Sequence, residues 1–309
     1  MAVVLQILAS GFAAGAVYGL VAVGYAVVFR LTGVVHFAFA ELIALGVFVT
    51  LYAAAGSGPV SQTSVGGVRF LLALVVGLVV TAAASAGSYL LAIEPYRARG
   101  SVIGWVGASL AVAFALRTLL QVSFSRETYV FPDPLPFDRV GAAGFWHVGG
   151  ATIQARSLFV AAAAFVLAGI ATYLLRATRH GRALEAIAQD YDAAVVSGLP
   201  VTLLVAAAFA VSGAIAALAA VLAAPSAAFD VDAAAAYGLY GLLAAAVTWF
   251  DPRRAFAAGI AVGLLQAAVT SARWGGVQLG GPAYRDVVPL LAGLAVLAWR
   301  SRSVREAVE

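Results

Sequence analysis

The sequence lacks the residues on which most soluble proteins and enzymes depend. It contains no cysteine, which excludes disulfides and thiolate metal sites, and it has only three histidines. Charged residues make up 10% of its 309 residues, well below the roughly 25% found in soluble domains. It has no Walker-type phosphate loop, H-E-x-x-H or G-x-S-x-G motif, so nothing favours an ATPase, a zinc protease or a serine hydrolase.

Apolar residues make up most of the sequence. The hydrophobic share is 63% and the mean hydropathy is +1.01. A single soluble core is too small to hide that much apolar surface, and several runs approach the roughly 20 residues that cross a bilayer. We therefore expect an all-α polytopic membrane protein, with residues 1–309 forming one transmembrane domain.

The apolar runs predict eight or nine transmembrane helices. Counted as nine, they cover residues 3–29, 34–52, 70–93, 102–122, 158–175, 201–224, 237–250, 255–272 and 287–299. Residues 123–155 are rich in proline and aspartate and predict an extracytoplasmic loop. Alternating residues around Gly149 and Gly150 are typical of a small β-hairpin inside that loop.

Arginine marks one side of the membrane. The net charge of +4 suits a nucleic-acid partner in a soluble protein, but here the arginines gather at alternate span ends. The residues in this group are Arg30, Arg97, Arg99, Arg176, Arg179, Arg182, Arg253, Arg254, Arg300, Arg302 and Arg305. The positive-inside rule places them in the cytoplasm, which predicts an outside N-terminus and an inside C-terminus.

Residues 179–199 are the densest polar run between two apolar segments and predict one amphipathic helix in the cytoplasm. Apolar residues at helical spacing are Leu184, Ile187, Tyr191 and Val195. The polar rim consists of Arg182, Glu185, Gln189 and Asp192. We expect the apolar stripe to dock in a partner's groove. A helix lying on the membrane surface is the alternative, but three acids after Arg182 disfavour it.

Glu41 is the acidic residue that lies deepest inside an apolar run. A buried carboxylate there is either a functional group or a hydrogen-bonding anchor between helices, and the sequence leaves both open. Arg117 is expected to extend toward the outer surface, and Asp230 and Asp232 to be solvated loop charges. The candidate translocation path comprises His36, Phe37, Phe39, Glu41, Tyr237 and Tyr240.

Several stretches resemble the branched-chain amino acid permease family of ABC importers. They are residues 15–25, residues 32–38 with Glu41, residues 178–198 and residues 209–222. Within the third, Asp192-Ala193-Ala194 followed by Gly198 resembles the Glu-Ala-Ala…Gly signature of the helix that docks on the ATP-binding subunit. The resemblance implies these coupling residues: Gly181, Arg182, Leu184, Glu185, Ile187, Ala188, Tyr191, Asp192, Ala193, Ala194 and Gly198.

The resemblance also implies an ABC importer permease fold and a set of partners. These are a second homologous permease in a heterodimer, two ATP-binding subunits and an extracytoplasmic substrate-binding protein. The chain would then bind no cofactor and catalyse no reaction, since ATP and magnesium belong to the ATP-binding subunits. It would be a multi-pass protein of a bacterial inner membrane, surrounded by lipid and without a nucleic-acid partner.

The second span departs from the family pattern. Members usually have Asn-Phe-Ala-His-Gly-Glu, whereas this chain has His36-Phe37-Ala38-Phe39-Ala40-Glu41. The substrate therefore stays open between a branched-chain amino acid, another amino acid and small metabolites such as urea or amides. A secondary transporter or channel that uses Glu41 as an ion or proton site is the alternative function, which the scarcity of other intramembrane charges disfavours.

Overall fold

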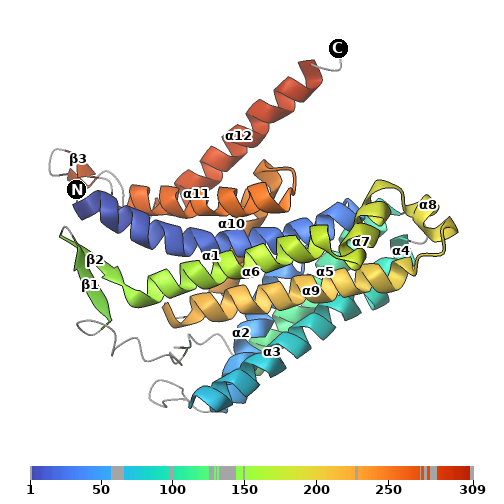
Figure 1. Cartoon of the computed structure of the whole chain (residues 1–309), viewed down its shortest axis with the longest axis horizontal. Coiled ribbons are helices and arrows are strands. Elements are labelled where there is room, and N and C mark those ends of the chain that lie inside the picture. The colour runs from blue at the N-terminus through green and yellow to red at the C-terminus, as the bar shows by residue number, and fades with distance from the viewer. Residues whose placement is uncertain are drawn as a thin grey trace.

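The computed structural model folds the chain into a bundle of long helices (Figure 1). It describes residues 2–56, 66–97, 101–124, 129, 131, 144–148, 150–226, 229–271, 273–274, 277–278 and 284–306. Most of the expected extracytoplasmic loop at 123–155 lies outside these described residues. Arg99, predicted to be cytoplasmic, lies outside them as well.

Within the described part of the chain, six helices are long and apolar enough to cross a membrane. They are α1 (Ala2–Thr32), α3 (Gly67–Gly87) with its continuation, α5 (Val102–Phe124), α6 (Ala155–Ala177), α9 (Val201–Ala223) and α11 (Pro252–Ser271). Shorter apolar helices are α2 (Phe39–Ala55), α10 (Val231–Val247) and the Val287–Arg300 part of α12 (Val287–Glu306). Each predicted span coincides with one of these helices, and the all-α polytopic fold is confirmed.

The remaining elements are short. A π-helix, η1 (Ser88–Ile93), and α4 (Glu94–Arg97) continue α3, and a 3₁₀ turn, η3 (Ala224–Ser226), follows α9. Between α6 and α9 lie α7 (Arg179–Gln189) and α8 (Tyr191–Val196). Two small antiparallel sheets pair β1 (Phe145–Val148) with β2 (Ala151–Gln154), and β3 (Arg273–Trp274) with β4 (Val277–Gln278). The pairing of Trp146 with Ile153 confirms the predicted hairpin.

Two predicted boundaries are wrong. Helix α2 begins at Phe39 and not at residue 34, because Gly33 ends α1 with a φ of +68° and a turn follows. Helix α10 begins at Val231 and not at residue 237, because the Asp230 carboxylate caps it by accepting from the Ala233 N–H at 2.6 Å. Each helix has 17 residues. That is about 25 Å, less than the hydrocarbon core of about 30 Å.

Helix α1 is the central helix of the bundle. It packs against α11, α9, α6 and α10, and Figure 1 shows α11 and α6 along its two sides. Glycines make the closest of these contacts: a Cβ on Gly15 would lie 2.6 Å from the Ile260 Cα, and one on Gly19 would lie 2.6 Å from the Phe256 carbonyl oxygen. These small residues at a spacing of four allow the close approach that makes α1 an interior helix.

The bundle has two distinct ends. The start of α1, the β1–β2 hairpin and β3 gather at one end in Figure 1. Helices α4, α7 and α8 gather at the opposite end, beside the last turns of α1. Helix α12 leads away from the bundle, although Arg300 donates to the Val247 carbonyl at 2.7 Å. The elements that join the long helices are therefore sorted into two surfaces, one at each end.

Candidate functional site

The polar segment at 179–199 forms two helices, and the prediction of one continuous helix is wrong. Thr178 caps α7 by accepting from the Gly181 N–H at 3.0 Å. The chain then breaks at Asp190, which is extended at φ −152° and caps α8 by accepting from the Ala193 N–H at 2.9 Å. A capping carboxylate satisfies a free helical N–H, so Asp190 starts a new helix where the pattern of apolar residues alone predicts continuation.

Helix α8 ends in a Schellman motif. Gly198 has a φ of +78°, its N–H donates to the Val195 carbonyl at 3.0 Å, and the Leu199 N–H donates to the Ala194 carbonyl at 3.2 Å. A residue with a side chain is strained at this φ, which explains glycine here. The predicted end of the polar helix is confirmed, and α7 and α8 form an elbow with defined geometry at each cap.

The elbow is held against the bundle by its own apolar residues. Ile187 and Ala194 are buried in a cluster with Phe209 and Trp105, and Leu184 packs against it. The expectation that the whole stripe faces a partner is therefore wrong for Ile187, because burying it within the chain removes its apolar surface from water. Glu185 accepts from Arg30 of α1 at 2.8 Å, so one rim residue also holds α7 in place.

Gly181 allows α7 to pack tightly against α6. A Cβ at this position would overlap the carbonyl groups of Leu174 and Leu175 in the last turns of α6. The close approach lets the chain turn from α6 into α7 without a longer loop. Gly181 is thus a packing residue at the entry into α7, and the coupling role that the resemblance implies for it stays a prediction.

The opposite face of the elbow is exposed. Its exposed residues include Arg182, Ala186, Ala188, Gln189, Asp192, Ala193, Val195, Val196 and Gly198. Val196 is the most exposed of the apolar residues, with 88% of its surface accessible. Tyr191 is partly buried and contacts the bundle. The elbow therefore presents small and apolar residues on both helices, with Arg182 near the start of α7 and Asp190 and Asp192 where the two helices meet, which suits a protein partner.

A second candidate site lies where α2, α5 and α10 meet. Arg117 of α5 donates to a Glu41 oxygen at 3.4 Å and also to the Asp232 carboxylate. Glu41 is 7% exposed and its second oxygen has no hydrogen-bond partner among the described residues. Arg117 is thus an ion-pairing residue whose side chain is 32% exposed, and it links the buried Glu41 to the exposed Asp232.

The arginine joins the first turns of the two short helices. Glu41 lies in the first turn of α2, and Asp232 in the first turn of α10. A carboxylate is favoured there because the free N–H groups of a helix start carry partial positive charge. The prediction that Asp230 and Asp232 lie in a loop is wrong, since Asp230 caps α10 and Asp232 lies in its first turn and pairs with Arg117, but Asp232 is solvent-exposed as expected.

The three residues before Glu41 in the candidate path have different surroundings. His36 is buried against Phe209, with ring centroids 5.2 Å apart, and its Nε2 lies 3.4 Å from the Ser88 hydroxyl of η1. Phe39 is fully buried and packs on Gly24 and Tyr25. The Phe37 side chain is exposed, while its N–H donates to Ser109 at 3.4 Å. His36 and Phe39 therefore have no exposed surface that a solute can reach in this conformation.

Tyr237 and Tyr240 of α10 belong to an aromatic cluster that centres on Tyr18 of α1. The Tyr18 ring centroid lies 5.5 Å from that of Tyr237 and 5.1 Å from that of Tyr240. The Tyr18 hydroxyl donates to Gln266 of α11 at 2.9 Å. Sequence reasoning missed Tyr18 and Gln266, although an amide in the middle of an apolar run is a signal of the same kind as Glu41.

Helix contacts connect the candidate path residues of α2 and α10. Gly238 lies against Ala40, where a Cβ on the glycine would be 2.5 Å from that of the alanine. The backbones are therefore close between Phe39 and Glu41 on one side and Tyr237 on the other. Among the described residues, no group of three or more histidines and acids is placed to hold a metal ion.

A bundle of apolar helices, with a capped polar elbow at one end and ion-paired residues in its interior, has the features of a membrane transport subunit. Comparison with known proteins defines it further. Residues 7–297 match the family described as Branched-chain amino acid transport system / permease component, and the chain belongs to this family. It is an ABC importer permease, a multi-pass inner-membrane protein and not an enzyme.

Relatives with established names are similar over nearly the whole chain. One is the high-affinity branched-chain amino acid transport system permease protein BraD of Pseudomonas aeruginosa, 25% identical over 97% of this chain and 95% of the relative. Another is the permease protein LivH of the same kind of system in Escherichia coli K12, 24% identical over 95% of this chain and 92% of the relative. The coverage extends the likeness to both ends of the bundle.

Proposed function

We propose that this chain forms one half of the membrane pathway of an importer for a branched-chain or other small amino acid. Both relatives are named as permease proteins of branched-chain amino acid transport systems, and each relative is matched along more than nine-tenths of its length. A second homologous permease completes the pathway as a heterodimer. Two ATP-binding subunits carry ATP and magnesium, and an extracytoplasmic protein delivers the substrate.

The observation that carries this proposal is the capped elbow of α7 and α8. It connects α6 with α9, and α9 packs on α1, α2 and α3, so a displacement of the elbow is passed to the interior helices. Its outer face offers Ala188, Ala193 and Val196, while Ile187 and Ala194 attach it to the bundle. We assign the outer face to the groove of an ATP-binding subunit.

Charge supports the orientation. The arginines at the end of α1, the end of α6 and the start of α11 lie at the elbow end of the bundle, which is therefore assigned to the cytoplasm (Figure 1). The end with the start of α1 and the β1–β2 hairpin then faces outward. The N-terminus lies outside and the C-terminus inside, as expected from the sequence.

The substrate path is assigned to the region of the two short helices. Helices that start or stop inside a transporter expose their polar ends at the depth where a solute must pass. Helices α2 and α10 adjoin there, and Arg117 closes the gap between their first turns through Glu41 and Asp232. Since Glu41 is ion-paired, we assign it to holding this closed state. The alternative of a secondary transporter or channel is not favoured by the family.

The elbow is tested by Ala188→Asp, at an exposed position of α7. A buried charge at a helix–groove contact costs several kcal/mol in affinity, so the ATP-binding subunit should no longer copurify with the permease and transport should stop. The control is His147→Asp, which introduces the same acid at an exposed position of the hairpin, at the other end of the bundle. Normal copurification and transport with Ala188→Asp would refute the coupling role.

A further inference from the structure

A cavity of about 220 Å³ with several polar groups in its lining lies between α1 and α11, at the end of the bundle that we assign to the outside. By volume it holds roughly seven waters at about 30 Å³ each, the size of a small metabolite. Its floor is made of small residues, and its polar groups come from both helices and from the turn before α12. The lining includes Ser10, Gly11, Gln266, Thr270, Ser271 and Arg285.

The buried amide of Gln266 is the unusual group in this cavity. Its side chain is 3% exposed, and its oxygen accepts from Tyr18 at 2.9 Å. Its Nε2 is buried without a hydrogen-bond partner among the described residues. An unsatisfied buried N–H₂ costs about 1 to 3 kcal/mol, so a donor left in this state beside a cavity points to an acceptor that comes and goes.

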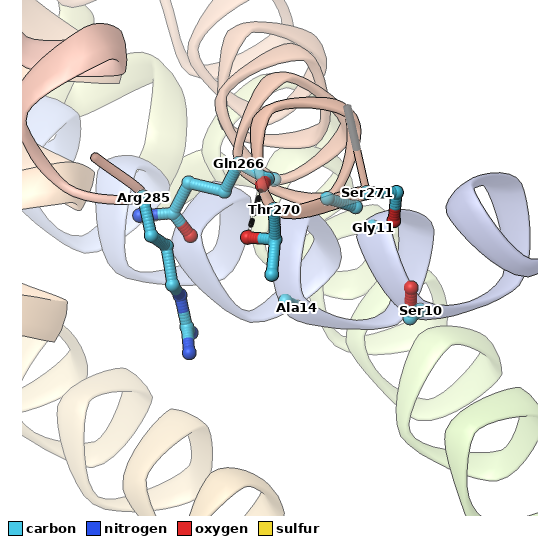
Figure 2. A pocket seen from close by; sticks show the side chains of 9 residues that line it. Ser10, Gly11, Ala14, Gln266, Thr270, Ser271 and Arg285 are labelled. Carbon is cyan, nitrogen blue, oxygen red and sulfur yellow. Dashed lines mark hydrogen bonds between the residues drawn. The ribbon is translucent and has the colours of Figure 1, made fainter. Parts of the chain in front are cut away.

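Arg285 adds positive charge next to this donor. Figure 2 shows Gln266 and Arg285 at one side of the cavity, Ser10 at the other and Thr270 between them. Arg285 is half exposed and forms an ion pair with Asp286, in which its Nε lies 3.9 Å from the Asp286 Oδ1 atom, too far for a hydrogen bond between these two atoms. A guanidinium and an amide N–H₂ are both donors, and together they suit a carboxylate.

The hydroxyl groups complement the other end of such a ligand. The Thr270 hydroxyl donates to the backbone carbonyl of Gln266 at 2.8 Å, and the Ser10 hydroxyl donates to the backbone carbonyl of Gln6 at 2.8 Å. Each hydroxyl oxygen therefore retains lone pairs that accept hydrogen bonds. The lining thus has donors at one side and acceptors at the other, the arrangement required by a molecule with both a carboxylate and an ammonium group.

We infer that this cavity is an entry site that binds the carboxylate of an α-amino acid at Arg285 and Gln266 and its ammonium at Thr270 and Ser10. The inference rests on the proposed function, because it takes an amino acid as the substrate and this end as the outer one. What the inference adds is the location of the site. The cavity adjoins the tyrosine cluster, because Tyr18 of that cluster donates a hydrogen bond to Gln266 of the cavity lining.

The experiment measures equilibrium binding of radiolabelled L-leucine to the permease–ATPase complex in lipid nanodiscs, without the substrate-binding protein. The wild type should bind leucine, whereas leucinamide, which lacks the carboxylate, and 4-methylpentanoate, which lacks the ammonium, should compete at least tenfold more weakly. Arg285→Gln and Gln266→Leu should each weaken leucine binding at least tenfold. Arg253→Gln, the same charge change at an exposed position on the other end of α11, is the control.

Gln266 is buried. If Gln266→Leu does not fold for that reason, Arg285→Gln alone decides whether the site exists. Equal leucine binding by wild type and Arg285→Gln, or equal competition by the two analogues and leucine, would overturn the site. No leucine binding by the wild type would overturn it too. These outcomes are separate from the proposed function, which the ATPase copurification of Ala188→Asp tests without reference to leucine.

Discussion

Helices α1 and α5 are both apolar enough to cross a membrane, yet they occupy opposite places in the molecule. In α1, 78% of the most apolar stretch is buried inside the protein, and in α5 only 11% is. Lipid and protein interior are both apolar, so the tendency to leave water is the same for the two helices. Their difference teaches that apolar content identifies a span, while the close approach of small residues decides which span becomes central.

The glycines of the two helices show the reason. Gly15 and Gly19 of α1 lie against the α11 backbone, where a Cβ would overlap atoms of the neighbour. Gly107 of α5 has no atom within 4 Å of the place where its Cβ would be. Dispersion contacts increase steeply as backbones approach, so Gly15 and Gly19 of α1 allow packing between long helices that Gly107 of α5 does not. Gly104, the other glycine of α5, lies against Tyr96 of the adjoining short α4.

The largest effect is expected for a bulky residue at the α1–α11 contact. Gly15→Leu needs space that the Ile260 backbone occupies, so it should cost more than about 4 kcal/mol and abolish folded protein in detergent extracts. Gly107→Leu, the same change in α5, should fold as the wild type does. Fluorescence-detected size-exclusion chromatography measures both, and equal profiles for the two variants would break the comparison.

An intermediate effect is expected at Arg117, the residue of α5 that forms an ion pair with the buried Glu41. Arg117→Ala leaves Glu41 buried without its counter-charge, which should destabilise the fold by about 3 kcal/mol. Glu41→Gln should recover most of that loss in the double variant, since the neutral amide needs no cation. Thermal unfolding in nanodiscs tests this, and a double variant no more stable than Arg117→Ala would show that the charge is not the cause.

The smallest effect is expected from truncating one apolar side chain in each helix. Val21 of α1 is fully buried and lies against Gly241, so Val21→Ala should cost about 1 to 2 kcal/mol. Val122 of α5 is 80% exposed, so Val122→Ala should change stability by less than about 0.5 kcal/mol. Thermal unfolding measures the loss of stability of each variant relative to the wild type, and only Val21→Ala should show a clear loss.

At the elbow, the sequence predicted the segment, its capped end and its polar character, but not its internal break or the direction of Ile187. The apolar spacing of Leu184, Ile187 and Tyr191 is compatible with docking on a partner or on the chain itself. Only the positions of Phe209 and Trp105, distant in sequence, decide that Ile187 packs inward. Periodicity reports which side of a helix is apolar and carries no information about what covers it.

The interior charges follow the same division. A single carboxylate in an apolar run was enough to mark Glu41 as buried and in need of a partner. The partner is Arg117, separated from it by 76 positions in the chain, and Asp232 joins them from a third helix. No local pattern relates these residues, so nothing in the sequence indicated that Arg117 pairs with Glu41 and Asp232 or that Asp230 caps α10.

The sequence by itself determined the class of protein and the rough extent of its apolar segments, and it grouped the arginines at alternate span ends. Those features depend on composition and spacing within a single segment, and each segment leaves water for an apolar phase as a unit. The tertiary structure alone decided that α2 and α10 begin beside one another, that Tyr18 joins Tyr237 and Tyr240, and that Gln266 opens onto a cavity. These depend on contacts between distant segments, whose geometry arises only when the helices pack.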